Sequence, residues 1–168
     1  MSRNLLILRH AKSAWDTDAS TDFERPLAKR GEAEAPRVGR WLSDKALVPD
    51  FVVSSPAVRA KQTAVSVCKE LGIKKKAIHW DERIYMGDTE ALLKVLGDCP
   101  KKVRTVMIVG HNPGLEELLL YLVGSKVKIP KDGKLLTTAG TAHLKMPNNW
   151  NKLGSGSAKV VSVNRPGR

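Results

Sequence analysis

Four basic side chains that could bind or transfer an anionic group each follow an apolar segment of this 168-residue sequence: Arg9, His10, Arg59 and His111. Arginine can grip the oxygen atoms of a phosphate group through two parallel hydrogen bonds, which lysine cannot do equally well. Histidine changes its protonation state near neutral pH. If the four side chains meet, they form a site for an oxyanion rather than a surface that reads nucleic-acid bases.

Whether they meet depends on the elements that carry them. Apolar segments alternate with helical patterns along the chain, and no linker or repeat divides it. Strands are predicted at residues 5–8, 51–53, 77–80, 103–109, 141–145 and 159–163, and helices at residues 30–47, 56–71, 89–96 and 113–123. Such alternation predicts an α/β fold, a three-layer α/β/α sandwich with a mostly parallel central sheet. At this length we expect residues 1–168 to form a single domain.

The carboxyl ends of the predicted strands should gather the candidate side chains. Ligands of open α/β sheets bind beyond these ends, so we expect the two histidines and two arginines at one edge of the sheet. Ser55 and Asn112 are each followed by proline, which predicts that they cap the N-termini of two helices. Free N–H groups at those termini would also favour an anion.

The charge of the chain is strongly positive and unevenly distributed. Lys and Arg total 29 against 17 Asp and Glu, a formal charge of +12. Residues 1–68 hold 11 basic and 8 acidic side chains, and residues 69–168 hold 18 and 9. The lysines of the second half fall between apolar segments, which is typical of solvated loops. They lack the interleaved aromatic residues of single-stranded nucleic-acid platforms, and we expect no nucleic-acid partner.

Other classes of protein are disfavoured by composition. No apolar run approaches the roughly 20 residues that span a bilayer, so we expect no membrane partner. Cys68 and Cys99 fit no metal or redox spacing and are interpreted as reduced thiols of a cytoplasmic protein. No cluster of histidines and carboxylates predicts a metal site, and we expect no metal and no cofactor. A monomer and a small homo-oligomer are both compatible with the sequence.

Four stretches of the chain carry a family resemblance. In order over residues 4–125 they are LRHAKS (8–13), DFERPL (22–27) with Arg30-Gly31 after it, SSPAVRAKQT (54–63) and VGHNPG (109–114). They resemble the motifs of the histidine phosphatase (phosphoglycerate mutase-like) superfamily, and within it the small SixA-type phosphohistidine phosphatase branch. Ala11 stands where the superfamily more often has glycine, and alanine occurs in the SixA-like branch. No long insertion separates Arg59 from His111, so the resemblance implies a phosphoglycerate mutase-like fold without a large cap and with an open pocket.

The resemblance implies roles for the four basic side chains. His10 matches the nucleophile, which takes the phosphoryl group onto a ring nitrogen as a transient phosphohistidine. Arg9, Arg59 and His111 match the pocket that binds the phosphoryl oxygens, and His111 is also counted among the catalytic residues. Because His10 must attack as a neutral imidazole, we expect one of its ring nitrogens to donate to a backbone carbonyl. Metal-independent hydrolysis follows from the same resemblance.

Three further residues are candidates through the resemblance. The superfamily uses a carboxylate to protonate the leaving group, and here Glu82 is preferred to the adjacent Asp81 for its spacing to Tyr85. Arg25, in its Arg-Pro-Leu setting, is expected either to line the pocket or to anchor its loop. Ser13, on the loop after the nucleophile, is a candidate donor to phosphate.

Three functions compete at this point. The resemblance favours a phosphatase that acts on protein phosphohistidine, whose leaving imidazole can depart after protonation from solvent. A broad phosphatase of small phosphate esters is the alternative among enzymes, because an open pocket admits them. A basic module that binds nucleic acid or an acidic protein is the alternative from another class.

Overall fold

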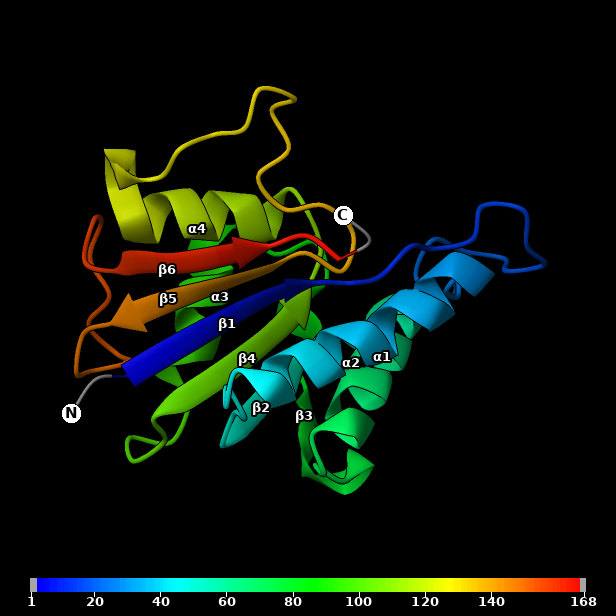
Figure 1. The fold of residues 1–168 in the computed structure, drawn as a ribbon, viewed down its shortest axis with the longest axis horizontal. Helices are drawn as coiled ribbons and strands as arrows, with labels where there is room; N and C mark the ends of the chain where they lie inside the picture. Colours follow the sequence, from blue (N-terminus) through cyan, green and yellow to red (C-terminus); the bar gives the residue numbers. More distant parts are fainter. Residues whose placement is uncertain (1–2, 167–168) are drawn as a thin grey trace.

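The predicted strands form one six-stranded sheet in the computed structural model, which describes residues 3–166 (Figure 1). The strands are β1 (Arg3–Arg9), β2 (Phe51–Ser54), β3 (Ile78–Trp80), β4 (Thr105–Gly110), β5 (Thr141–Met146) and β6 (Lys159–Asn164). Their order is β3-β2-β4-β1-β5-β6. The first four in this order are parallel, whereas β5 runs antiparallel to β1, and β6 antiparallel to β5. The mostly parallel α/β sheet predicted from the sequence is confirmed.

Helices cover both faces of the sheet, so the fold has three layers with the sheet in the middle (Figure 1). They are α1 (Lys29–Asp44), α2 (Val58–Glu70), α3 (Thr89–Gly97) and α4 (Gly114–Val123), with short 3-10 helices η1 (Lys75–Ala77), η2 (Glu82–Ile84) and η3 (Gly124–Lys126). Along β1, Leu6 and Leu8 pack with α1 and α2, and Leu5 and Ile7 pack with α3 and α4. All four side chains are fully buried. A continuous apolar strand is therefore required here, because side chains on both of its faces are removed from water.

Helix α2 begins two residues later than predicted, and α4 begins one residue later. Their N-cap positions are Ala57 and Pro113, and neither makes a side-chain capping bond. The Ser55 hydroxyl accepts from the Ala57 N–H at 3.2 Å and also contacts His111, while the Asn112 amide donates to Glu116 and to a backbone carbonyl. The predicted capping roles of Ser55 and Asn112 are wrong, because each residue lies before the N-cap position and its side chain also bonds to a distant partner, His111 or the Leu136 carbonyl.

The loop that follows β1 is held closely against α1 and α2. A Cβ atom on Gly31, in the first turn of α1, would lie 2.1 Å from the Lys12 carbonyl oxygen. No larger residue fits there without moving the loop. From α2, the Val58 N–H donates to the Phe23 carbonyl at 3.0 Å. The packing of these helices therefore decides where the residues after His10 lie.

The surplus of lysine lies on the surface. All nine lysines that were interpreted as solvated are exposed: Lys74, Lys75, Lys76, Lys101, Lys102, Lys126, Lys128, Lys131 and Lys134. Cys68 and Cys99 are free and buried, and burial raises the pKa of each thiol to about 12. Across residues 3–166, no helix has the length and apolar character needed to cross a membrane.

Candidate active site

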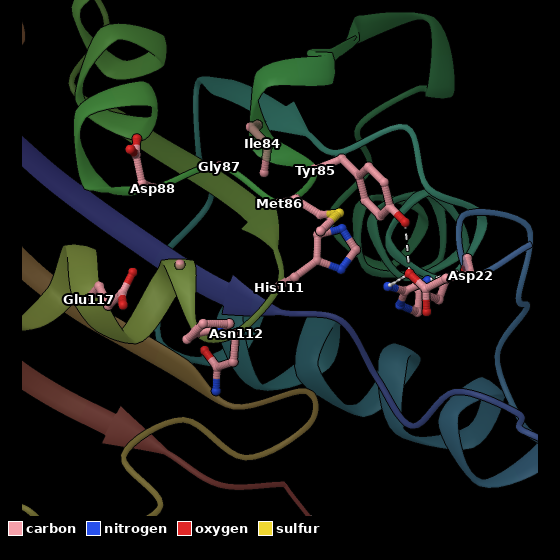
Figure 2. Close-up of a pocket in the computed structure, with 12 residues that line it drawn as sticks. Asp22, Ile84, Tyr85, Met86, Gly87, Asp88, His111, Asn112 and Glu117 are labelled. Atoms are coloured by element: carbon pink, nitrogen blue, oxygen red, sulfur yellow. Dashed lines mark hydrogen bonds and ion pairs between the residues drawn. The ribbon is translucent and has the colours of Figure 1, made fainter.

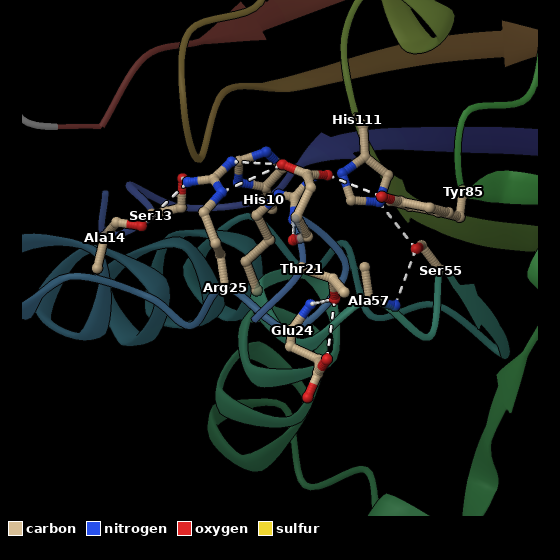
Figure 3. A network of polar contacts seen from close by, with 12 residues as sticks. His10, Ser13, Ala14, Thr21, Glu24, Arg25, Ser55, Ala57, Tyr85 and His111 are labelled. Atoms are coloured by element: carbon tan, nitrogen blue, oxygen red, sulfur yellow. Dashed lines mark hydrogen bonds and ion pairs between the residues drawn. The ribbon is translucent and has the colours of Figure 1, made fainter. Parts of the chain in front are cut away.

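The carboxyl ends of the parallel strands bring the predicted side chains together. His10 follows β1 and His111 follows β4, and their ring centroids lie 5.2 Å apart. The positive charges of Arg59, Arg9 and Arg25 all act on His10 and lower its pKa. Figure 3 shows His10, Arg25 and His111 in one network of polar contacts. Five of the candidate residues thus share one edge of the sheet.

His10 is held as a neutral ring with a defined tautomer. Its Nδ1 lies 2.7 Å from the carbonyl oxygen of Ala11. A carbonyl only accepts, so Nδ1 carries the hydrogen and Nε2 keeps a free lone pair. Burial above all, together with Arg59 and Arg9, lowers the pKa of His10 to about 4. The carbonyl that a neutral histidine was expected to need is therefore the one of the next residue in the chain.

His111 is also buried and neutral. Its Nε2 lies 2.8 Å from the Ser55 hydroxyl, and its Nδ1 is buried without a partner among residues 3–166. Burial lowers the pKa of His111 to about 3, with His10 and Arg59 contributing in the same direction. The Tyr85 ring packs edge-on against it at 5.5 Å. His111 therefore has one ring nitrogen ready for a hydrogen bond with a ligand.

Arg59 is held by a carboxylate that the sequence reasoning did not single out. Its Nη1 donates to the Asp22 carbonyl at 2.7 Å and its Nη2 to Asp22 Oδ2 at 2.9 Å, while its Nε is buried without a partner among the described residues. The Tyr85 hydroxyl donates to the same oxygen at 2.8 Å. This bond and those from Arg59 and Arg25 lower the pKa of Asp22 to about 2. The only signal in the sequence was the place of Asp22 at the head of the DFERPL stretch.

Arg25 joins the loop after β1 to this carboxylate. Its Nη1 donates to the Ser13 hydroxyl at 2.9 Å and to the Ala14 carbonyl at 3.0 Å, and its Nε and Nη2 each lie 3.1 Å from Asp22 Oδ1. Its guanidinium also lies over the ring of Trp15 at 3.7 Å. Arg25 therefore anchors the loop and places its charge beside His10, and Ser13 is bound to Arg25.

Arg9 lines a different cavity from Asp22. Its Nη1 donates to the Leu136 carbonyl at 3.0 Å, and its Nε is buried without a partner among residues 3–166. The segment that holds Leu136 is tied to α4, because Glu116 accepts from the Leu136 N–H at 2.9 Å. The loop before β5 thus fixes the direction of Arg9, a contact that the motifs did not reveal.

Glu82 makes no contact with the two histidines among those that the structure gives for the described residues. Glu82 begins η2, is exposed, and is absent from the lining of the cavity beside His111. Asp81 is bound to Arg83 at 2.6 Å and lines a different cavity. The carboxylates that do line the cavity at His111 are Asp22, Asp88 and Glu117.

Two cavities adjoin the site. The first has a volume of about 450 Å³ and is lined by Asp22, Arg59, Ile84, Tyr85, Met86, Gly87, Asp88, His111, Asn112, Pro113, Gly114 and Glu117 (Figure 2). The second, of about 550 Å³, is lined by the basic side chains of Arg9, Lys12, Arg30 and Lys134 and by Glu34 and Glu116, and Asn112 lines both cavities. Within residues 3–166, no group of three or more histidine, cysteine or acidic side chains could hold a metal ion.

The fold and the site together define a class of protein: an α/β enzyme that handles phosphoryl groups at the carboxyl ends of its parallel strands. The sequence model of the histidine phosphatase superfamily (branch 1) matches residues 5–88, half of the chain. The chain belongs to this superfamily and is a phosphatase. The matched segment contains Arg9, His10, Arg25 and Arg59 and ends before His111.

Two relatives are similar to this chain along most of its length. An uncharacterized protein of Mycobacterium leprae is 31% identical over 165 residues, which cover 95% of this chain and 99% of the relative. A chloroplastic protein of Arabidopsis thaliana, also uncharacterized, is 34% identical over 137 residues, 77% of this chain and 63% of the relative.

Solved structures of similar shape include SixA proteins. One is a protein from Agrobacterium tumefaciens that is provisionally assigned as the phosphohistidine phosphatase SixA. It has a TM-score of 0.82 and 28% identity to this chain, and the match covers 99% of this chain and 100% of that one. Another is the protein histidine phosphatase SixA in complex with tungstate, with a TM-score of 0.79, 23% identity, and coverage of 95% of each chain. The phosphoglycerate mutase-like fold expected from the motifs is therefore confirmed.

Proposed function

We propose that this phosphatase removes phosphoryl groups from histidine side chains of other proteins, through a covalent intermediate on Nε2 of His10. The observation that carries the proposal is the state of His10. Its Nδ1–H is committed to the Ala11 carbonyl at 2.7 Å, its pKa is lowered to about 4, and the charges of three arginines reach it. A neutral nucleophile beside fixed positive charges is what phosphoryl transfer requires.

The first step transfers the phosphoryl group to the enzyme. The substrate imidazole takes a proton from solvent on its unsubstituted nitrogen. The lone pair of His10 Nε2 then attacks phosphorus, the N–P bond of the substrate breaks, and the substrate histidine leaves as neutral imidazole. Arg9, Arg59 and the free Nδ1 of His111 would bind the phosphoryl oxygens, on which negative charge must be stabilised.

The second step returns the enzyme to its starting state. Water attacks the phosphorus of phosphorylated His10, the N–P bond to Nε2 breaks, and inorganic phosphate is released with the protons of the water. Because Nδ1 keeps its hydrogen throughout, His10 leaves as a neutral ring. The hydrogen bond to Ala11 therefore serves both steps.

The carboxylates around the site favour phosphohistidine over phosphate esters. The leaving oxygen of an ester needs a proton donor, whereas the protonated imidazole of phosphohistidine does not. Asp22 has a pKa of about 2 and carries no proton near neutral pH. Glu82, the predicted donor, lies outside the cavity lining, and its role stays a prediction. The SixA name of the neighbour from Agrobacterium tumefaciens points to the same substrate.

A broad phosphatase of small esters is the second candidate. The cavity at His111 holds about 450 Å³, enough for a small organic phosphate, and the chain has no long insertion to cover it. The two candidates share the nucleophile and differ in the leaving group.

Comparing wild type with His10→Ala tests the nucleophile. Release of phosphate from a phosphohistidine protein should fall by about 10³-fold or more, as expected when a covalent nucleophile is lost. Alkaline quenching of the wild type should trap a phosphorylated His10, and EDTA should leave the rate unchanged. His79→Ala is the matched control, because His79 is exposed and stacks on Phe51 away from the site.

Three outcomes would contradict parts of the proposal. Activity that survives in His10→Ala removes the nucleophile assignment. Inhibition by EDTA argues against metal-independent hydrolysis. A higher kcat/KM for p-nitrophenyl phosphate than for phosphohistidine protein favours the second candidate. The predicted role of Glu82 is checked separately: a large loss for the ester alone in Glu82→Gln would support it as proton donor.

A further inference from the structure

The cavity at His111 has an uneven charge that the reaction itself does not explain. Four of its lining residues are charged: Arg59 and the carboxylates Asp22, Asp88 and Glu117. Asp22 is bound by Arg59 and Arg25. In Figure 2, His111 lies between Asp22 on one side and Asp88 and Glu117 on the other. The part of the cavity farther from Arg59 is therefore rimmed by two carboxylates.

Two buried groups mark this cavity as a place for a ligand. His111 is 8% exposed and its Nδ1 has no partner among the described residues; Arg59 is 6% exposed and its Nε has none. Buried polar atoms without partners carry a cost that a bound ligand removes. A phosphoryl group held by His111 and Arg59 leaves the rest of the cavity, toward Met86 and the two rim carboxylates, for the group that carries it.

We propose that the cavity at His111 receives the leaving group, and that Asp88 and Glu117 select phosphorylated groups whose carrier is neutral or positively charged. The inference rests on the proposed function, because it assigns the second half of the same site. A carrier with a second anionic group would bring that group toward two carboxylates. A protonated imidazole or an ammonium group would be attracted by them.

The neighbouring cavity has the opposite character. Its lining has four basic side chains, Arg9, Lys12, Arg30 and Lys134, and two acidic ones, Glu34 and Glu116. A leaving group that extended there would therefore be favoured by a negative charge. The two cavities therefore favour leaving groups of opposite charge. The reacting form of phosphohistidine, with its ring protonated, matches the cavity at His111.

The test measures binding of three phosphates that share a two-carbon carrier. They are ethanolamine phosphate, ethylene glycol monophosphate and phosphoglycolate, whose carriers are positive, neutral and negative. Dissociation constants are measured by calorimetry at low ionic strength on the His10→Gln protein, which cannot turn them over. We expect ethanolamine phosphate to bind about tenfold more tightly than phosphoglycolate, as for charges that interact partly through water.

Removing the rim charges should abolish this preference. In Asp88→Asn with Glu117→Gln, added to the same background, the ratio of the two constants should fall to about one. Asparagine keeps the cap of α3, where Asp88 Oδ1 accepts from the Ala91 N–H at 2.9 Å. The control Glu32→Gln with Glu90→Gln changes the net charge equally at exposed positions outside both cavities and should keep the tenfold ratio. Raising the salt to 1 M should also remove the preference.

The outcomes distinguish failure of this inference from failure of the proposed function. Equal binding of the three compounds, all displaced by inorganic phosphate, overturns the selection and leaves the phosphatase site intact. Tighter binding of phosphoglycolate that is lost in Lys134→Gln places the leaving group in the other cavity and overturns the assignment. Failure of inorganic phosphate itself to bind contradicts both the inference and the proposed function.

Discussion

The two halves of the sheet contribute to the candidate site in different ways. In the parallel half, β1, β2 and β4 are followed directly by His10, Ser55 and His111. The ring of His111 contacts both of the other side chains. The antiparallel half, β5 and β6 with the loop before them, supplies backbone. The Leu136 carbonyl accepts from Arg9, and the Ala139 N–H donates to the His10 carbonyl at 3.0 Å.

The parallel half therefore supplies the side chains of the candidate site, and the antiparallel half supplies backbone groups that hold them in position. A site built from side chains depends on which residue stands at each position, whereas a backbone contact depends on the path of the chain and tolerates many residues. The match of the superfamily model, residues 5–88, falls within the half that supplies side chains. Substitutions should therefore affect activity in the parallel half and stability in the antiparallel half.

The largest effect in this comparison is expected for Arg59→Met. Methionine keeps an apolar stem on α2 but removes the charge that faces His10 and His111, so kcat/KM should fall by about 10²- to 10³-fold, as when one preorganised donor is lost. Arg40→Met is the matched control, because Arg40 pairs with Glu70 at the surface and is 58% exposed. Steady-state kinetics with a phosphohistidine protein measures both. An equal loss in the two variants would contradict the assignment.

A smaller effect is expected for Asp22→Asn, which tests a positioning residue. Asparagine keeps the shape but weakens the bonds that hold Arg59 and Arg25, and misplaced arginines should lower kcat/KM by about tenfold. Since the pKa of Asp22 is about 2, the residue is ionised at all pH values from 4 to 8, and the loss should be the same across this range. A loss that changes with pH would instead indicate a proton donor. Asp16→Asn, at an exposed position of the same loop, is the control.

The smallest effect on activity is expected for His143→Gln in β5. The Nε2 of His143 lies 2.8 Å from Asn4 Oδ1, and loss of this bond should cost about 1 kcal/mol of folding free energy while kcat/KM changes less than twofold. Burial and Lys145 lower the pKa of His143. The unfolded chain therefore takes up the proton first, and wild-type stability falls as pH drops below about 6.5. In His143→Gln, the free energy of unfolding measured by urea titration should differ less between pH 5 and pH 7 than it does in the wild type. A fall in kcat/KM of much more than twofold in His143→Gln would contradict the division of roles between the two halves of the sheet.

Much of the fold was accessible from the sequence because its signals are local. The apolar runs at residues 5–8 and 51–53 became β1 and β2 with small changes at their ends, and the late strands formed as expected. Parallel pairing followed from alternation with helices. The convergence of Arg9, His10, Arg59 and His111 followed in turn, because strand ends in a parallel sheet share one edge.

The parts that escaped prediction depend on contacts between distant residues. Ser55 and Asn112 have the residue types of helix caps, but partners across the site compete for their polar atoms. Asp22 and Arg59 are 37 positions apart and meet only because the loop after β1 packs on the start of α2. The spacing that favoured Glu82 is likewise a local pattern, whereas the side chains that line the cavity depend on how η2 packs in the fold.

The sequence alone determined the elements and the chemical types at their ends, since hydrophobic periodicity and side-chain chemistry are properties of short stretches. The tertiary structure alone decided which hydrogen-bond partner each polar group found. It committed His10 Nδ1 to the Ala11 carbonyl, left His111 Nδ1 without a partner among residues 3–166, and placed Asp22 against two arginines. The physical reason is that protonation state and direction depend on burial and neighbouring charge, which exist only once the chain has folded.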